Sequence, residues 1–128
     1  MSRPLLLVPL LLSTACLGLG VRVADLPDSD LGLPIEDVSL ESGVSRDEAI
    51  SIALTFWARR GLACGGPDRI RETPSSWVVS NAVGFGADPG EPIRISKKTG
   101  GVDLGKTTCF ETLGALLDEP FPDRCRRL

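Results

Sequence analysis

The stretch IRISKKTGGVDLG, residues 93–105, predicts a β hairpin. Its first half alternates isoleucine with polar residues, which is the period of a strand that presents one face to a core. Gly100 and Gly101 then supply the positive φ angles that a tight reversal requires. Val102 and Leu104 resume the alternation in a short second strand.

The end of this hairpin also matches the phosphate-binding loop of nucleotide-binding proteins. Residues 100–107 read GGVDLGKT, which fits the pattern G-x-x-x-x-G-K-[ST]. In such a loop a buried strand leads directly to the first glycine, but here the turn residues 96–99 intervene. Too little chain is expected to follow for the parallel strands of a nucleotide-binding fold. We therefore interpret the match as a turn, a strand and a helix cap, with Lys106 in solvent, and expect no nucleotide or other cofactor.

Residues 45–61, upstream of the hairpin, predict a helix. Ser45 and Glu48 have the spacing of a capping box, and Gly61 can adopt the left-handed conformation that ends a helix. Apolar residues recur at helical spacing on one side, at Ala49, Ile50, Ala53, Leu54, Phe56 and Trp57. This helix should pack on an apolar surface.

A further strand and a second helix complete the expected fold. After a polar loop over residues 64–75, the run SWVVSNAV has the β-branched and aromatic content of a strand. Thr108 and Glu111 repeat the capping-box pattern and predict a helix that ends near Leu117. The expected fold is therefore α+β: an N-terminal helix packed on a small antiparallel three-stranded meander, followed by a short C-terminal helix.

The first 15 residues have the composition of a secretory signal peptide. Arg3 is followed by an apolar run over residues 5–12 and then by small residues. The run is far shorter than the roughly 20 residues that a membrane-spanning helix needs. We therefore expect an exported protein.

Cys16 decides how such a signal peptide would be processed. Residues 12–16, LSTAC, resemble the bacterial lipobox, whose cysteine becomes the lipidated first residue of the mature protein, although Ser13 stands where leucine is usual. We expect Cys16 to carry a lipid that holds the protein at a membrane and facing the periplasm. Plain secretion, without a lipid, is the alternative.

The mature chain divides into a tether and one domain. Residues 16–43 are acidic and interrupted by proline and glycine, which predicts a flexible solvated tether, with an edge strand near residues 36–40 as the alternative. Residues 44–128 are nearly balanced in charge and suffice for a single small domain. We expect no basic face for nucleic acid.

Residue types that commonly act in catalysis or bind metals are scarce. The chain has no histidine, and its four cysteines, at positions 16, 64, 109 and 125, show no CxxC spacing. The usual general base and the usual metal ligand are therefore missing. Neighbouring carboxylates such as Asp118 and Glu119 are interpreted as solvated charges. We expect no enzyme, no catalytic residue and no metal site.

The expected topology pairs Cys64 with Cys125 in a disulfide. A helix antiparallel to the first strand ends near the edge where that strand begins, which places Cys64 there. Cys109 follows the third strand at the opposite edge and is expected to stay a thiol, while the second helix brings Cys125 back. If Cys16 is retained without a lipid, a second bridge from Cys16 to Cys109 is the alternative.

Four elements, in order, resemble the YrhB-type immunity proteins of bacterial toxin systems. The helix opens with SRDEAISIAL, the strand reads SWVVS, the hairpin reads GEPIRISKKTGGVDLG and the closing element reads TTCFETLGAL. That family has an SxEEALxIA helix, a GW strand, a GxxPxIVDKKTGEV hairpin and a threonine-capped helix. The similarity covers residues 44–117. The signal peptide, the short loop over residues 82–91 and the cysteine-bearing tail depart from the family.

The resemblance implies an immunity-type protein that neutralises a co-encoded cognate toxin by direct binding and occlusion, and the signal peptide predicts that this protein is exported. Trp77 and Phe85 are the aromatic candidates for contact with this partner, with core packing as the alternative for each. The DEAIxIAL helix and the IxIxKKTGxV hairpin are also similar to PepSY modules, which are suspected of restraining peptidases. A lipoprotein domain of unassigned role is the third alternative. Apart from the toxin and the membrane, no partner is expected.

Overall fold

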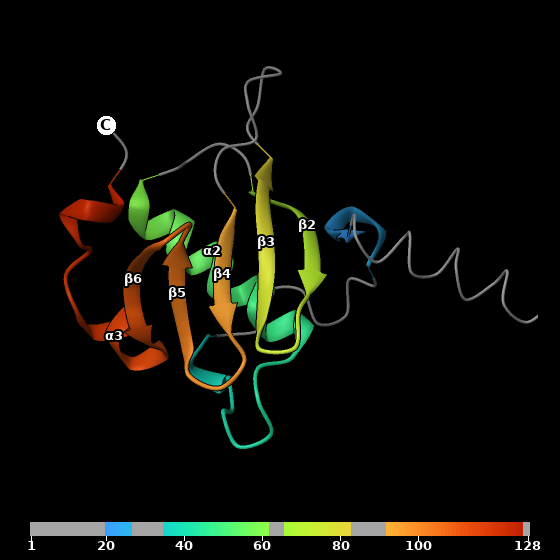
Figure 1. Cartoon of the computed structure of the whole chain (residues 1–128), viewed down its shortest axis with the longest axis horizontal. Coiled ribbons are helices and arrows are strands. Elements are labelled where there is room, and N and C mark those ends of the chain that lie inside the picture. The colour runs from blue at the N-terminus through green and yellow to red at the C-terminus, as the bar shows by residue number, and fades with distance from the viewer. Residues whose placement is uncertain (1–19, 27–34, 62–65, 83–91, 127–128) are drawn as a thin grey trace, which may run out of the picture.

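A six-stranded antiparallel sheet with one long helix across one face forms the fold (Figure 1). The computed structural model describes residues 20–26, 35–61, 66–82 and 92–126. Sheet order follows chain order from β1 to β6, so each strand pairs with its neighbours in sequence. The chain is therefore α+β, as expected.

The strands and helices have the following bounds. The strands are β1 Val21–Arg22, β2 Gly66–Glu72, β3 Ser76–Ala82, β4 Ile93–Ser96, β5 Gly100–Leu104 and β6 Thr107–Thr112. The α-helices are α2 Arg46–Arg60 and α3 Leu113–Asp118. Within the described residues, the short 3₁₀ helices η1 Val23–Asp25, η3 Ile35–Asp37 and η4 Asp123–Cys125 accompany them.

The long helix α2 begins and ends where its capping residues predict. The Ser45 hydroxyl accepts from Glu48 N at 3.2 Å, and Glu48 Oε1 accepts from Ser45 N at 2.9 Å, so the capping box is confirmed. Gly61 closes the helix in the left-handed conformation, with φ 92°. These bonds satisfy amide groups at the start of the helix that have no partner within it.

The buried surface of α2 extends beyond the apolar side that its sequence predicts. Ser51 and Ile52 are buried, whereas Leu54 is 41% exposed. The sheet covers one side of α2 with the core residues Ile70, Val79, Ile93, Ile95 and Val102. The η3 segment contacts α2 as well, and this second neighbour buries side chains that a one-sided helix would expose.

The expected three-stranded meander is wrong, because the sheet has six strands. The three expected strands exist and form its centre, as β3, β4 and β5. Strand β2 lies within the stretch expected to be a polar loop, residues 64–75. Its sequence GPDRIRE places only Ile70 among the core residues, with charged residues on either side. One apolar residue gives too weak an alternation to reveal a strand.

Strand β6 replaces the first turn of the expected second helix. Thr108 and Glu111 only imitate a capping box, because both belong to the strand. The actual N-cap of α3 is Thr112, whose hydroxyl accepts from Ala115 N at 3.1 Å. The phosphate-loop match is therefore a hairpin between β5 and β6, whereas a phosphate loop leads from a strand into a helix.

Two parts of the expected tether pack against the domain. Val21 and Arg22 of β1 pair with Ile70 and Arg69 of β2. Val23 and Leu26 are buried in the core, and two further residues, Ile35 and Val38, pack against it. The domain therefore includes residues before its expected start at residue 44.

The disulfide joins Cys109 to Cys125, so the expected pairing of Cys64 with Cys125 and the free thiol at Cys109 are wrong. The error follows from the missed strand: Cys109 lies in β6 rather than at a helix start, and η4 packs beside β6 at the same edge of the sheet. The two Cα atoms are 5.9 Å apart. Cys64 lies outside the described residues.

An aromatic cluster holds the C-terminal segment on the core. Phe121 contacts Phe56 and Phe110, with ring centroids 5.3 and 5.5 Å apart. The guanidinium of Arg59, near the end of α2, lies over the rings of Phe110 and Phe121 and donates to the carbonyl oxygens of Leu116 and Glu119. The tail is therefore part of the domain.

We expect replacement of both Cys109 and Cys125 by alanine to lower the free energy of unfolding by about 3 kcal/mol, the value from loop-closure entropy for a short loop. The disulfide spans 16 residues. Denaturant unfolding under oxidising conditions measures the loss. Under reducing conditions the native chain also lacks the cross-link, so the difference should largely disappear. Peptide mapping that links Cys64 to Cys125 would contradict the pairing.

The capping box should also make stability depend on pH. Burial of Glu48 raises its pKa, but hydrogen bonds from Ser45 N, Ser39 N and the Ser45 hydroxyl outweigh this effect, and the pKa lies below its ordinary value of 4.5. A carboxyl whose pKa is lowered by folding stabilises the protein above its unfolded pKa. The stabilisation is lost as the pH falls through the folded pKa.

We therefore expect Glu48→Gln to lower the free energy of unfolding by about 1 kcal/mol at pH 7, a typical value for a capping interaction. The difference from the native protein should vanish as the pH falls below 4.5, through the lowered pKa of Glu48. Thermal or urea unfolding at several pH values measures it. Glu41→Gln, at an exposed carboxyl nearby, is the control and should change little. A difference independent of pH would contradict this account.

Candidate functional site

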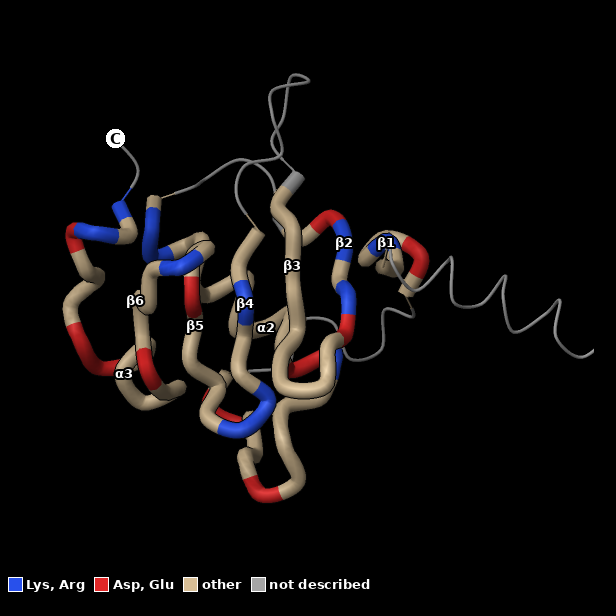
Figure 2. Tube along the Cα trace, viewed as in Figure 1, with Lys and Arg blue, Asp and Glu red and all other residues tan. Residues whose placement is uncertain are grey.

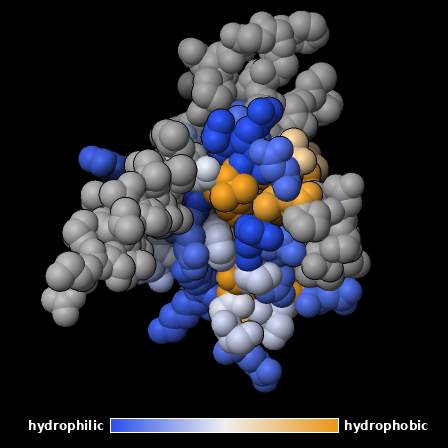
Figure 3. All heavy atoms as spheres, turned by 90° about the vertical axis from the view of Figure 1, so that its right-hand side faces the viewer, coloured by the Kyte–Doolittle hydropathy of each residue, from blue (hydrophilic) through white to orange (hydrophobic). Residues whose placement is uncertain are grey.

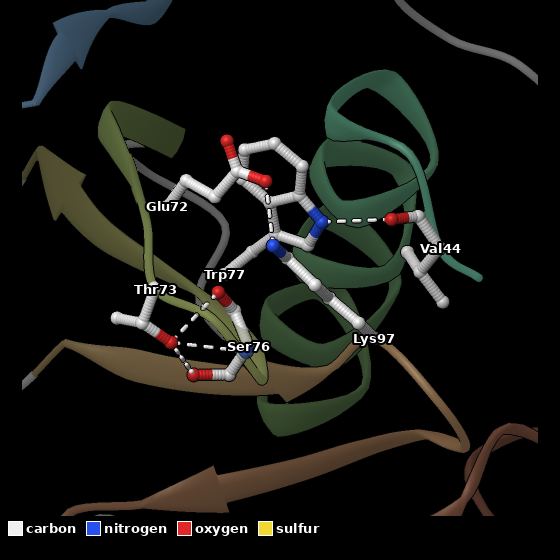
Figure 4. Close-up of polar contacts among 6 residues, drawn as sticks. All are labelled: Val44, Glu72, Thr73, Ser76, Trp77 and Lys97. Atoms are coloured by element: carbon white, nitrogen blue, oxygen red, sulfur yellow. Dashed lines mark hydrogen bonds and ion pairs between the residues drawn. The ribbon is translucent and has the colours of Figure 1, made fainter.

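Trp77 ties the start of α2 to the sheet. Its Nε1 donates to Val44 O at 2.8 Å (Figure 4). Val44 N in turn donates to Lys97 O at 2.8 Å, and Lys97 N donates to Ser75 O at 3.0 Å. These bonds connect the residue before the helix cap with the β2–β3 turn and the β4–β5 turn. The indole is therefore held by its hydrogen bond to Val44, whose backbone is itself fixed by these two turns.

The side chain of Lys97 covers one face of this indole. Its Nζ lies 5.1 Å from the ring centroid of Trp77 and 2.5 Å from Glu72 Oε2 (Figure 4). Glu72 stands opposite Trp77 in the pairing of β2 with β3. Because the Glu72 side chain is 59% exposed, the ion pair adds little stability. Its main effect is to position the lysine over the ring.

A pocket of about 310 Å³ opens beside Trp77, at the β1 edge of the sheet. Apolar side chains and charged side chains both line it: Val21, Ile70 and Trp77 with Arg46, Arg71 and Glu72. Figure 3 shows this side of the molecule, where apolar atoms lie exposed among charged ones. Val21 is 46% exposed, which is high for a residue of its type beside a core.

The short strand β1 forms one wall of the pocket. Gly20 lies against β2 with φ +75°, and a Cβ at this position would come within 2.8 Å of Ile70 O. Only glycine combines this backbone angle with so close an approach. Arg46, at the first turn of α2, lies on another side of the pocket. Its Nε has no hydrogen-bond partner among the described residues but lies 3.8 Å from Asp47 Oδ1 in an ion pair.

Arginines gather on the face of the sheet opposite α2. The pairing aligns Arg22 of β1 with Arg69 of β2, and it aligns Arg71 of β2 with Val78 of β3 and then with Arg94 of β4. Residues paired across strands share a face, and the alternate residues Ile70, Val79 and Ile93 fill the core on the other face. We call the four residues Arg22, Arg69, Arg71 and Arg94 the arginine face.

No carboxylate of the described residues lies within 4.0 Å of any of these four guanidinium groups. Figure 2 shows the basic segments of β1, β2 and β4 in one half of the sheet. A hollow of about 190 Å³ lies among them, lined by Arg69, Arg71, Val78, Ser80 and Pro92. The nearly balanced charge of residues 44–128 therefore conceals a local basic surface.

Of the predicted site residues, the structure places two. Trp77 is half-buried, packs against the core and lines the pocket, and its contact with a partner stays a prediction. Cys125 is bonded to Cys109. Cys16, Cys64 and Phe85 lie outside the described residues. Sequence reasoning missed the arginine face, although the alternation in RIR and IRI, residues 69–71 and 93–95, was its visible signal.

Comparison of the chain with known protein families, with curated proteins and with solved structures finds no match. The resemblance to immunity proteins, and the weaker one to PepSY modules, therefore stay predictions. Within the described part of the chain, no helix has the length and apolar character needed to cross a bilayer.

Proposed function

We propose that the chain is an exported immunity-type protein that neutralises a cognate bacterial toxin by direct binding and occlusion. The observation that carries this proposal is the pocket beside Trp77. Trp77, Ile70 and Val21 form its apolar lining, and charged residues accompany them. Tight protein interfaces have this anatomy, with a few buried anchors surrounded by a charged rim.

The pocket suits a single large side chain of a partner. Its volume of about 310 Å³ lies at the lower end of the range for small-molecule pockets, roughly 300–1,000 Å³. An apolar or aromatic residue of the toxin would pack against Trp77, while Arg46, Arg71 and Glu72 select its charged neighbours. Occlusion requires no catalytic group in this chain.

Trp77 is also prepared for binding before a partner arrives. Its hydrogen bond to Val44 O and the lysine over its ring restrict the indole to one orientation. A partner therefore does not have to order this side chain, which lowers the entropic cost of association.

The first experiment is functional. The toxin candidate is the product of the neighbouring reading frame, directed to the periplasm. We expect co-expression of this chain to restore growth, and the purified pair to form a stable complex. A neighbour that is not toxic, together with no recovered complex, would contradict the proposal and favour a PepSY-like module.

The pocket itself is tested by Val21→Glu. A carboxylate introduced on its apolar wall should weaken toxin binding at least about 30-fold, equivalent to the loss of a hot-spot contact. Titration calorimetry or surface plasmon resonance measures the change. Leu54→Glu is the matched control, because Leu54 is also an exposed apolar residue, at 41%, but lies outside the pocket. Equal affinities of the two variants would rule out the pocket as the toxin site.

The proposed lipid anchor is tested at Cys16. Cells fed a palmitate analogue should label the native chain but not Cys16→Ser, because the lipid is attached through this cysteine. Gel fluorescence after click chemistry reports the label. Equal labelling of the two proteins would overturn the lipid anchor and favour plain secretion.

A further inference from the structure

We propose that the arginine face docks on anionic phospholipid headgroups of the membrane that holds the Cys16 lipid. The domain then lies against the bilayer instead of at the end of a long tether. The inference uses the lipid anchor of the proposed function and is independent of the toxin. Three observations carry it: the length of chain before β1, the charge of the open sheet face and the side on which the pocket lies.

The chain between the anchor and the sheet is short. Only residues 17–19 separate Cys16 from Gly20, which packs against β2. A chain extends at most about 3.6 Å per residue, so Gly20 can lie no more than about 14 Å from Cys16. A lipid on Cys16 therefore holds the β1 edge of the sheet at the membrane surface.

The charge of the face complements such a surface. Arg22 stands directly opposite Arg69, an arrangement that costs stability when no anion is present. Arg71 and Arg94 flank Val78 in the next row, and no described carboxylate lies within 4.0 Å of the four guanidinium groups. Anionic headgroups supply the missing counter-charges, and each arginine near such a surface strengthens binding by about fivefold.

The charges on this face are ordered from one edge of the sheet to the other. The arginines occupy strands β1, β2 and β4, on the side of the anchor. The acidic Asp103 appears only on β5, opposite Arg94, and Glu111 follows on β6. Strand β2 also carries two carboxylates, Asp68 and Glu72, next to its arginines in sequence. Glu72 forms an ion pair with Lys97. The basic half of the face thus lies where the anchor brings the membrane.

Docking in this orientation leaves the pocket accessible. The pocket includes Ile70, Trp77 and Arg46, which belong to the core side of the sheet and to α2. Of the arginine face, only Arg71 also lines the pocket, and Arg22, Arg69 and Arg94 lie on the opposite face of the sheet. One surface can therefore lie on headgroups while the other receives a protein. An acidic protein is the competing occupant of the arginine face, and the experiment separates the two.

The test uses the mature chain with Cys16→Ser, so that binding depends on the face and not on the lipid. Its partners are vesicles of phosphatidylcholine with and without phosphatidylglycerol. We expect cosedimentation with the anionic vesicles only, weakening as salt is raised. Arg69→Glu with Arg94→Glu, two residues that do not line the pocket, should weaken binding at least about 25-fold, from fivefold for each arginine.

Lys98→Glu with Lys106→Glu is the matched control. It changes the net charge by the same amount at two exposed turn residues away from the arginine face, and should retain most of the vesicle binding. Circular dichroism establishes that both variants are folded. An equal loss in the two variants, or equal binding to neutral vesicles, would overturn the proposal.

A third result would also overturn the membrane-docking proposal. If the arginine variant loses the toxin but keeps the anionic vesicles, the face belongs to a protein partner. If no toxin is found while vesicle binding behaves as expected, the proposed function fails and the membrane-docking inference stands.

Discussion

The hydrogen bond from Trp77 Nε1 to Val44 O fixes the start of the long helix against the sheet. Val44 precedes the N-cap, so this bond and the capping box together set the first turn of α2 relative to β3. The position of the helix then decides which sheet residues become core and places Arg46 beside the pocket. The site and the core thus share one constraint, and a change at Trp77 acts on both.

The parts of the fold that depend on local chemistry were predictable. Ser45, Glu48 and Gly61 act on their own backbone neighbourhood, and the helix that they bound is confirmed. Strands β4 and β5 alternate clearly, β3 is rich in β-branched and aromatic residues, and all three are confirmed as well. Strand β2 was not predictable, because it places a single apolar residue in the core, and β6 was not, because threonine suits both a helix cap and a strand. The wrong disulfide followed from those two omissions.

The candidate site also has a part that the sequence could predict and a part that it could not. Trp77 was a candidate for partner contact because it is an aromatic residue in a predicted strand, and it lines the pocket. Arg22, Arg69 and Arg94 lie far apart in sequence and approach one another only through the register of four strands. The spacing of these residues along the chain does not reveal how the strands pair. Surfaces that belong to a sheet, rather than to one helix or loop, require the strand order before they can be recognised.

The agreement of sheet order with chain order has a kinetic consequence. From β2 onward each strand pairs with the strand just made, whereas β1 and β2 pair across the long helix α2. Pairings between strands that follow one another closely in sequence form faster than pairings that close long loops. In the proposed exported protein, each hairpin from β2 to β6 can form as soon as its second strand emerges from the membrane. The tail, which completes the aromatic cluster and carries Cys125, arrives last. Oxidation of the cysteine pair then acts as a lock on an already assembled sheet and not as a guide to its assembly.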